Sequence, residues 1–352
     1  MNTKVIVCME EDDKAVLAEA GRIIRQGGLV AFPTETVYGL GGDALNPLSS
    51  QKIYQAKGRP SDNPLIVHIC RFEDIYRLVS KAPAHRKMLA AAKRLAEAFW
   101  PGPLTMILPK SEEVPFETTG GLSTVAVRFP AHKTAQALIA AAGGYVAAPS
   151  ANTSGRPSPA LAKYVLEDME GSIDMVIDGG EVGIGLESTI VDLTVEPAEI
   201  LRPGYISRDM LQEILGRVEK DEAGETGGQA PRAPGMKYRH YAPHGDMTVV
   251  SGEKENVMAY INEQLSLQKK AGKKSGVIAT DESAARYRAD IVKSVGSRAD
   301  ELSAAKHLYT VLREMDEEGA EVIYSEAFTG KGIGEAVMNR LLKAAGYHMV
   351  QV

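Results

Sequence analysis

The first 215 residues combine two apolar periods, one typical of helices and one typical of strands. Apolar residues at every third or fourth position predict helices over residues 14–27, 83–99 and 133–142. Short apolar or alternating runs predict strands over residues 29–32, 64–69, 104–108, 124–129, 145–148, 189–193 and 199–202. Because these elements do not alternate strictly, they predict an α/β chain of the α+β kind with a mixed, twisted sheet.

From residue 247 onward the pattern changes to strands that alternate with helices. Strands are predicted over residues 247–252, 275–280, 289–296 and 321–328, and helices over residues 254–268, 301–317 and 333–345. Regular alternation of this kind is typical of a small parallel, Rossmann-like α/β domain.

Glycine, proline and charge dominate the stretch between these two patterns, as in "GETGGQAPRAPG". We therefore predict a catalytic domain over 1–217, a linker over 218–246 and a C-terminal domain over 247–352. The second half of the linker, "MKYRHYAPHG", contains tyrosines that a spacer does not need. We expect this part to fold back over the active site.

Composition adds limits to this picture. The chain has 352 residues, 44% of them hydrophobic and 24% charged, which is typical of a globular protein. Its net charge of −6 gives no overall positive potential that would attract nucleic acid or acidic lipid. Its two cysteines, Cys8 and Cys70, cannot form a disulfide framework and favour a reducing compartment. No signal peptide and no apolar run of about 18 residues is found, so we expect a cytoplasmic protein without a membrane contact.

Common catalytic signatures do not account for the polar motifs. The sequence has no GxxxxGK[ST] phosphate loop. A serine-hydrolase interpretation has partial support from SxxK at 49–52, SDN at 61–63 and an incomplete KTG at 133–135. The first two elements are too close together for such a site, and the third lacks its glycine.

A cationic segment precedes the strand at 64–69. Lys57 and Arg59 flank a glycine, Asn63 follows, and His68 lies on the strand face opposite Leu65 and Val67. We expect Lys57 and Arg59 on a loop, where a lysine offers a point charge to phosphate and an arginine offers a planar fork. A solvated loop and a core histidine are the alternative interpretation.

Other polar groups also stand at predicted strand ends. "PSANTSGRPSP" follows the strand at 145–148 and is rich in hydroxyl groups, although a surface turn would have a similar composition. Thr124 and Arg128 share one face of their strand, because their spacing is even. The cations of this half that can converge at strand ends are Lys57, Arg59, Arg128, Arg156 and Arg202. A polyanion such as a nucleoside triphosphate would suit them.

Five motifs, in order, resemble the YrdC-like family of threonylcarbamoyl-AMP synthases. They are "PTETVYGLGGDA", "KGRPSDNPLIVHI", "PSANTSGRPSP", "LESTIVDL" and "ILRPGYIS". The KxR and SxN signature of the family is matched by Lys57, Arg59, Ser150 and Asn152. The linker "APGMKYRHYAP" and the C-terminal α/β pattern resemble the two-domain form of the family.

The resemblance implies a nucleotidyltransferase. Threonine takes up bicarbonate or CO2 as a carbamate, which attacks the α-phosphate of ATP to give threonylcarbamoyl-AMP and pyrophosphate. A threonylcarbamoyl-transferase complex then modifies tRNA. The resemblance assigns catalysis to Lys57, Arg59, Ser150 and Asn152, L-threonine to Thr36, His68, Arg128 and Ser188, and ATP to Arg59, Asn63, Thr124, Ser150, Ser158, Arg202 and the lid residue Tyr238. Mg²⁺ is expected on the ATP phosphates and not in a protein-built metal site.

Two other functions are alternatives to this synthase activity. A binding module for structured RNA, with incidental nucleotide binding, would show salt-dependent affinity that does not need Asn152 or His68. The acidic net charge weighs against it, although an RNA contact stays an open expectation. A carbamoyl-transfer relative would carry acylphosphatase-like and zinc-finger parts, which this sequence lacks.

Overall fold

The computed structural model describes residues 2–8, 13–221, 231–234, 240–328 and 332–352. These residues form two compact units, neither of which is continuous in sequence. The first unit comprises Met1–Ser154, Pro159–Gly183 and Glu187–Tyr238, and the second comprises Gly155–Ser158, Ile184–Leu186 and Arg239–Val352. Two short segments that precede residue 187 therefore belong to the second unit.

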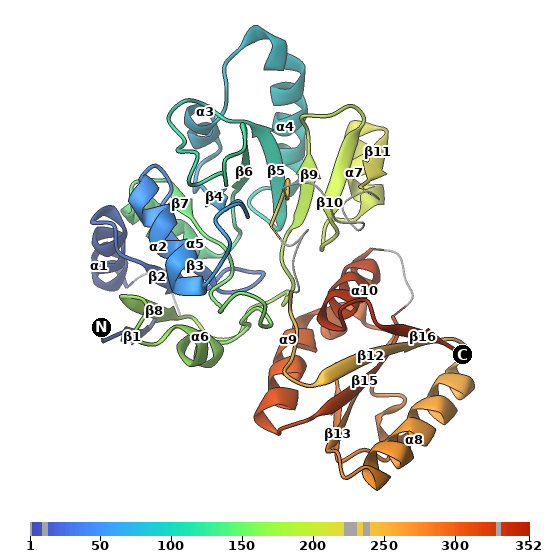
Figure 1. Ribbon diagram of the computed structural model, residues 1–352. Helices are drawn as coiled ribbons and strands as arrows, with labels where there is room; N and C mark the ends of the chain where they lie inside the picture. The colour runs from blue at the N-terminus through green and yellow to red at the C-terminus, as the bar shows by residue number, and fades with distance from the viewer. Residues whose placement is uncertain (1, 9–12, 222–230, 235–239, 329–331) are drawn as a thin grey trace. The chain divides into compact units, whose positions relative to one another are not determined.

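A large mixed sheet forms the centre of the first unit (Figure 1). Its strand order is β1-β8-β2-β3-β7-β4-β6-β5-β9-β10-β11, with both parallel and antiparallel neighbours. The strands are β1 (Lys4–Val7), β2 (Val30–Phe32), β3 (Gly39–Asp43), β4 (Ile66–His68), β5 (Leu104–Pro109), β6 (Thr124–Arg128), β7 (Val146–Ala147), β8 (Met175–Asp178), β9 (Thr189–Asp192), β10 (Ala198–Arg202) and β11 (Val218–Lys220). The prediction of a mixed sheet is confirmed.

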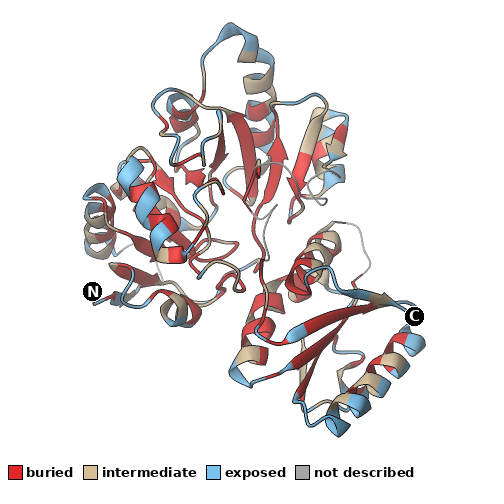
Figure 2. Ribbon diagram, in the orientation of Figure 1, coloured by how far each residue is buried: buried red, intermediate tan, exposed pale blue. Residues whose placement is uncertain are grey.

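Helices cover this sheet. Because side chains alternate along a strand, successive residues of one strand pack in different hydrophobic clusters. The helices are α1 (Lys14–Arg25), α2 (Pro47–Lys57), α3 (Ile75–Leu78), α4 (Arg86–Phe99), α5 (Lys133–Ala141), α6 (Ala162–Met169) and α7 (Arg208–Leu215). Leu65 and Val67 pack in the main core, whereas Ile66 packs on the opposite face with Ile107 and Ala126. Figure 2 shows that buried residues dominate the strands of this unit.

Helix α2 corrects one prediction, because Lys57 is the last residue of this helix and does not lie on a loop. Asn46 caps the helix at its start, and Gly58 ends it in the left-handed conformation, with φ of 59°. The helix was missed because part of its buried face is polar. Ser49, Ser50 and Lys57 are all buried, so the amphipathic pattern is hidden from the sequence.

The second unit contains a five-stranded, fully parallel sheet of order β14-β13-β15-β12-β16. Its elements are β12 (Asp246–Ser251), α8 (Lys254–Lys270), β13 (Ser275–Ala279), β14 (Ile291–Ser294), α9 (Glu301–Glu317), β15 (Val322–Glu326), α10 (Ile333–Ala344) and β16 (Met349–Gln351). Helix α8 lies on one face, and α9 and α10 lie together on the other (Figure 1). The predicted parallel α/β domain is confirmed. Among the described residues of the whole chain, no helix is both long and apolar enough to cross a membrane.

Candidate active site

A single row of cross-strand partners carries four polar side chains across the first unit. His68 of β4 pairs with Arg128 of β6, and Arg128 pairs with Thr105 of β5. Thr105 pairs with Ile190 of β9, which pairs with Arg202 of β10. Cross-strand partners share one face of a sheet, so residues from five separate strands form one row.

A β-bulge brings Arg202 onto this face. Ile200 pairs with Val191, but Arg202 pairs with the adjacent residue Ile190, so Leu201 is the extra residue of the bulge. Without the bulge, Arg202 would share the face of Ile200, which packs in the main core. The guanidinium of Arg202 instead donates to the carbonyl oxygen of Ser188 over 3.0 Å and to its Oγ over 3.2 Å.

Ser188 connects Thr105, in the middle of the row, with Arg202 at its end. Its Oγ lies 2.7 Å from Oγ1 of Thr105 and accepts from Nη2 of Arg202. Ser188, Thr105 and Arg202 are each at most 4% exposed. Sequence analysis missed Thr105; its place in the strand directly after "GPL" gave no functional signal, and only the register of β5 against β6 brings it here.

Arg128 is the centre of a second polar group. Its side chain is only 5% exposed, and its Nη1 donates to Oγ1 of Thr36 over 2.9 Å. Thr36 Oγ1 lies 2.9 Å from Oγ1 of Thr34. Arg128 Nη2 also lies 2.7 Å from Oε1 of Glu35. Sequence analysis missed Glu35, although a carboxylate between two threonines directly after a strand was a usable signal.

His68 lies beside Arg128 and is 3% exposed. Its Nδ1 is 3.2 Å from the carbonyl oxygen of Ile66. Burial, followed by the positive charge of Arg128, lowers the pKa of His68 from 6.5 to about 3. The imidazole is therefore neutral at physiological pH and offers a hydrogen bond and not a charge.

This buried, neutral histidine gives a prediction for pH dependence. An unfolded histidine binds a proton near pH 6.5, whereas folded His68 does so only near pH 3. Between these values the unfolded chain holds the extra proton, so stability falls as pH falls, by up to about 1.4 kcal/mol per pH unit.

In His68→Gln, we expect the free energy of unfolding to fall less steeply between pH 7 and pH 5. Urea unfolding at three pH values measures this slope, and His85→Gln, at a half-buried position outside this row, is the control. Equal slopes in wild type and His68→Gln would contradict the assignment.

Lys57 holds the loop of the SxN motif. Its Nζ is buried and donates to the carbonyl oxygen of Ser150 over 2.6 Å and to that of Asn152. The carbonyl oxygen of Lys57 in turn accepts from the backbone N–H of Ser154 over 2.8 Å. The structure therefore brings Lys57, Ser150 and Asn152 together, and it does so through the main chain of the loop.

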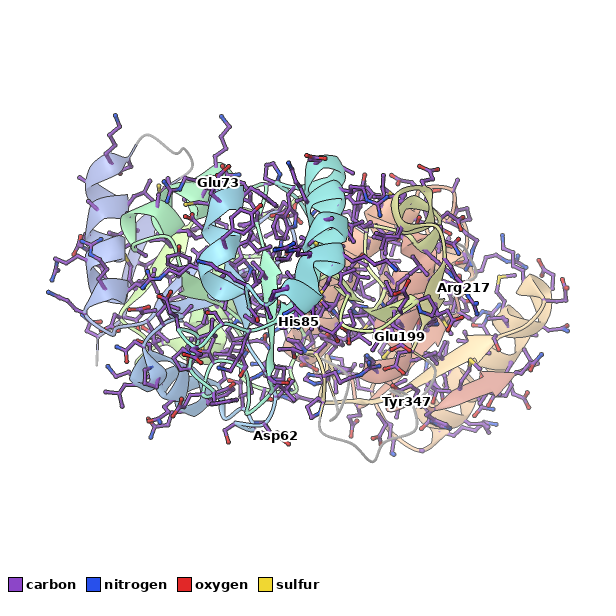
Figure 3. All side chains as sticks on the ribbon, turned by 90° about the horizontal axis from the view of Figure 1, so that it is seen from above. Asp62, Glu73, His85, Glu199, Arg217 and Tyr347 are labelled. Atoms are coloured by element: carbon purple, nitrogen blue, oxygen red, sulfur yellow. The ribbon has the colours of Figure 1, made fainter. Side chains whose placement is uncertain are left out.

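Arg59 is bound within its own turn. Its Nη2 donates to Oδ1 of Asn63 over 2.6 Å and to the carbonyl oxygen of Pro64 over 3.0 Å, and its Nε donates to the carbonyl oxygen of Asn63. Asn63 is 1% exposed, and its Nδ2 is buried and has no hydrogen-bond partner among the residues described. Asp62, in contrast, lies at the periphery (Figure 3). The turn thus presents Arg59 and Asn63 inward as one hydrogen-bonded pair.

The three remaining residues predicted to bind ATP are Thr124, Ser158 and Tyr238. Thr124 begins β6, four residues before Arg128, and is half-buried on the same strand face. Ser158 is buried and belongs to the second unit, where Nη2 and Nε of Arg313 donate to the carbonyl oxygen of the preceding Pro157 over 2.6 and 3.1 Å. Tyr238 lies outside the described residues.

The described part of the linker, residues 231–234, packs against the first unit. Ala233 is fully buried in the cluster that contains Ile66 and Ala126, on the sheet face of His68 and Arg128. Arg232 forms ion pairs with Asp192, Glu199 and Asp221, the latter two at 2.8 Å; Glu199 is labelled in Figure 3. The carbonyl oxygen of Pro234 lies 3.4 Å from Nη1 of Arg202.

The two units together match known proteins along nearly the whole chain. The Sua5, YciO and YrdC family model, described as "Telomere recombination", matches residues 22–204, and a second model, described as "Threonylcarbamoyl-AMP synthase, C-terminal domain", matches residues 206–346. The sheet with its cationic motifs, followed by a parallel α/β unit, thus defines the two-domain class of YrdC-like proteins. The chain belongs to the threonylcarbamoyl-AMP synthase family.

Individual relatives agree with this class over their full lengths. The threonylcarbamoyl-AMP synthase of Pyrococcus abyssi is 47% identical, with 99% of this chain and 100% of the relative covered. That of Bacillus subtilis is 44% identical, with 95% and 94% covered. A crystal structure of P. abyssi Sua5 complexed with L-threonine has a TM-score of 0.93 at 46% identity and covers 99% of this chain and 100% of that one.

Proposed function

We propose that this chain makes L-threonylcarbamoyl-AMP and pyrophosphate from L-threonine, bicarbonate or CO2, and ATP. The observation that carries the proposal is the polar row itself. A chain 47% identical to a threonylcarbamoyl-AMP synthase places His68, Arg128 and Arg202 on one buried sheet face, next to the hydroxyl groups of Thr36 and Ser188.

The threonine side of the site is assigned to four residues that lie close together. The planar fork of Arg128 suits a carboxylate, which it can grip with two nitrogens. Thr36 fixes this fork from one side. Neutral His68 and Ser188 offer hydrogen bonds to the uncharged parts of the substrate. A buried site with few water molecules strengthens each of these contacts.

The ATP side is assigned to Arg59, Asn63, Thr124, Ser150, Ser158, Arg202 and Tyr238, with catalysis by Lys57, Arg59, Ser150 and Asn152. Lys57 orients the loop of Ser150 and Asn152, and the cations offset the phosphate charge. The reaction then needs no covalent protein intermediate. The threonine nitrogen bonds to the carbon of CO2 and loses a proton, or bonds to the carbon of bicarbonate with loss of water, to give the carbamate. A carbamate oxygen then bonds to the α-phosphorus of ATP as the bond from that phosphorus to pyrophosphate breaks. Positioning and charge neutralisation are sufficient for such a transfer.

The proposal also includes a domain plan, a lid and a metal. Residues 1–217 form the catalytic domain, 247–352 the C-terminal domain, and 218–246 a linker that closes over the site with Tyr238; the burial of Ala233 on the face of Arg128 supports this closure. Closure would protect the mixed anhydride from water.

Mg²⁺ enters as part of the Mg–ATP substrate. No group of three or more His, Cys, Asp or Glu side chains in the described ranges could hold it, so the phosphate oxygens are its assigned ligands.

We further propose that the product passes to a threonylcarbamoyl-transferase complex that acts on tRNA, in the cytoplasm. The chain has only two cysteines, Cys8 and Cys70, too few for a disulfide framework, and this composition supports a reducing compartment. Direct contact of this chain with RNA is a separate expectation that filter binding at two salt concentrations would test.

The function is tested by pyrophosphate release from Mg–ATP with purified protein. L-threonine and bicarbonate are added separately and together. We expect release only with both substrates, because the carbamate is the nucleophile. Release with neither, or with threonine alone in bicarbonate-free and CO2-free buffer, would contradict the proposed reaction.

A further inference from the structure

Glu35 has both carboxylate oxygens buried, yet neither accepts a hydrogen bond from any residue that the structure describes. Its side chain is 15% exposed, and it lies on the turn between β2 and β3, between Thr34 and Thr36. A buried carboxylate without hydrogen bonds is costly, because burial removes the water that would otherwise solvate it. Such a group calls for a ligand or a partner with donors.

Arg128 is the cation that faces this carboxylate, and it is left in a similar condition. Its Nη2 lies 2.7 Å from Oε1 of Glu35, but this ion pair lacks hydrogen-bond geometry, and within the described ranges Nε and Nη2 are both buried without a hydrogen-bond partner. Nη1 donates to Thr36. The pair therefore neutralises its two charges while it leaves two donors and two acceptors unused.

The unused groups match the two ends of an amino-acid zwitterion. A carboxylate needs two donors in a plane, which Nε and Nη2 of one guanidinium provide. An ammonium group needs acceptors of negative charge, which the two oxygens of Glu35 provide. In an α-amino acid these two ends are adjacent, as Arg128 and Glu35 are. Binding would add no net charge to the buried site and would satisfy all four atoms.

His132 also lies near Glu35. Burial lowers the pKa of His132, and this effect is stronger than the rise caused by the negative charge of Glu35. A histidine kept neutral in this way does not neutralise Glu35 in place of the ligand. The charges that decide the match are those of Arg128 and Glu35.

We propose that Glu35 receives the α-ammonium group of the amino-acid substrate while Arg128 receives its carboxylate. Glu35 is thus a specificity-determining residue that selects a zwitterion over a simple carboxylate. The inference rests on the proposed function, because it takes the group bound at Arg128 to be threonine.

The test is direct binding, measured by calorimetry without ATP, of three ligands to the full chain. L-threonine carries both charges, 2,3-dihydroxybutyrate replaces the ammonium with a hydroxyl group, and L-threoninamide lacks the carboxylate. We expect wild type to bind threonine roughly 10- to 100-fold more tightly than either analogue, as the loss of a charged hydrogen-bonding partner predicts. Equal affinity for threonine and 2,3-dihydroxybutyrate would overturn the inference without any variant.

Variants then assign the selectivity to Glu35. In Glu35→Gln we expect threonine affinity to fall roughly 10- to 100-fold, while 2,3-dihydroxybutyrate affinity changes less than about three-fold. Glu35→Asp should recover part of the loss, and Glu112→Gln, at an exposed position, is the matched control. A merely structural role would weaken both ligands equally, which would also overturn the inference.

Pyrophosphate release by the same samples separates this inference from the proposed function. If release requires threonine and bicarbonate but Glu35→Gln leaves the ligand selectivity unchanged, the role of Glu35 is rejected and the proposed function is supported. If folded wild type releases no pyrophosphate but still prefers threonine to both analogues, the proposed function is rejected and the zwitterion site is supported. If wild type binds no threonine, the inference about Glu35 fails, and pyrophosphate release alone decides the proposed function.

Discussion

Replacing Lys57 with methionine is expected to lower kcat/KM for pyrophosphate release by at least about 100-fold. The ammonium group holds the carbonyl oxygens of Ser150 and Asn152, so its loss frees the loop that carries the SxN motif. Methionine keeps a similar side-chain length but offers no donor, and it leaves two carbonyl oxygens without their charged partner. A loop shift of about 1 Å is enough to cost two orders of magnitude when the reaction depends on positioning. The assay contains L-threonine, bicarbonate and Mg–ATP together.

A second lysine on the same helix provides the control for this prediction. Lys52 is exposed and its Nζ donates to the carbonyl oxygen of Gly27 over 2.6 Å, so Lys52→Met removes an equal charge from α2. We expect Lys52→Met to retain nearly full activity. Thermal unfolding of both variants shows whether the fold survives. If a folded Lys57→Met variant turned over like wild type, the assignment of Lys57 to catalysis would be wrong.

Replacing Arg128 with lysine is expected to raise KM for L-threonine roughly 100-fold while KM for ATP stays within about three-fold of wild type. A lysine preserves the positive charge but loses the planar pair of donors and the bond from Nη1 to Thr36. Its ammonium group is also shorter in reach, and burial in this site disfavours its charged form. The loss should therefore fall on the amino acid and not on the nucleotide. Steady-state kinetics with each substrate varied in turn measure this split.

Arg94→Lys makes the same chemical change at an exposed position of α4 and is expected to have no effect on either constant. Far-ultraviolet circular dichroism and thermal unfolding establish that Arg128→Lys is folded. A rise in KM for ATP of the same size as that for threonine would contradict the assignment of Arg128 to the amino-acid side. Wild-type values for both substrates would remove Arg128 from the site altogether.

The sequence was informative where side chains follow a simple period. The alternation of Leu65, Ile66, Val67 and His68 predicted which face His68 would occupy, and the pairing of β4 with β6 agrees with that prediction. The even spacing of Thr124 and Arg128 likewise held along β6. Alternating strands and helices after residue 247 predicted the parallel sheet. These features are local, so they can be read without knowing which strands are neighbours.

The sequence was uninformative where polar side chains are buried, because such residues normally face solvent. Helix α2 hides buried serines and a buried lysine on its inner face, so its helical period could not be seen and Lys57 was expected on a loop. Glu35 was overlooked for a related reason, because an acidic residue in a polar turn normally faces solvent. In both cases tertiary contacts stabilise a polar group at a place where propensity alone predicts exposure.

The sequence by itself determined the motifs, their order, the two-part organisation and the class of chemistry, since these depend on residue types and local periods. The tertiary structure decided which of the polar residues meet. Strand register places His68, Arg128 and Thr105 in one row, although Thr105 had given no signal. The bulge at Leu201 turns Arg202 to the face opposite to the one its spacing from Ile200 predicts. Register and bulges are set by long-range pairing between strands, and one residue of shift reverses every side chain, so no local pattern could have fixed them.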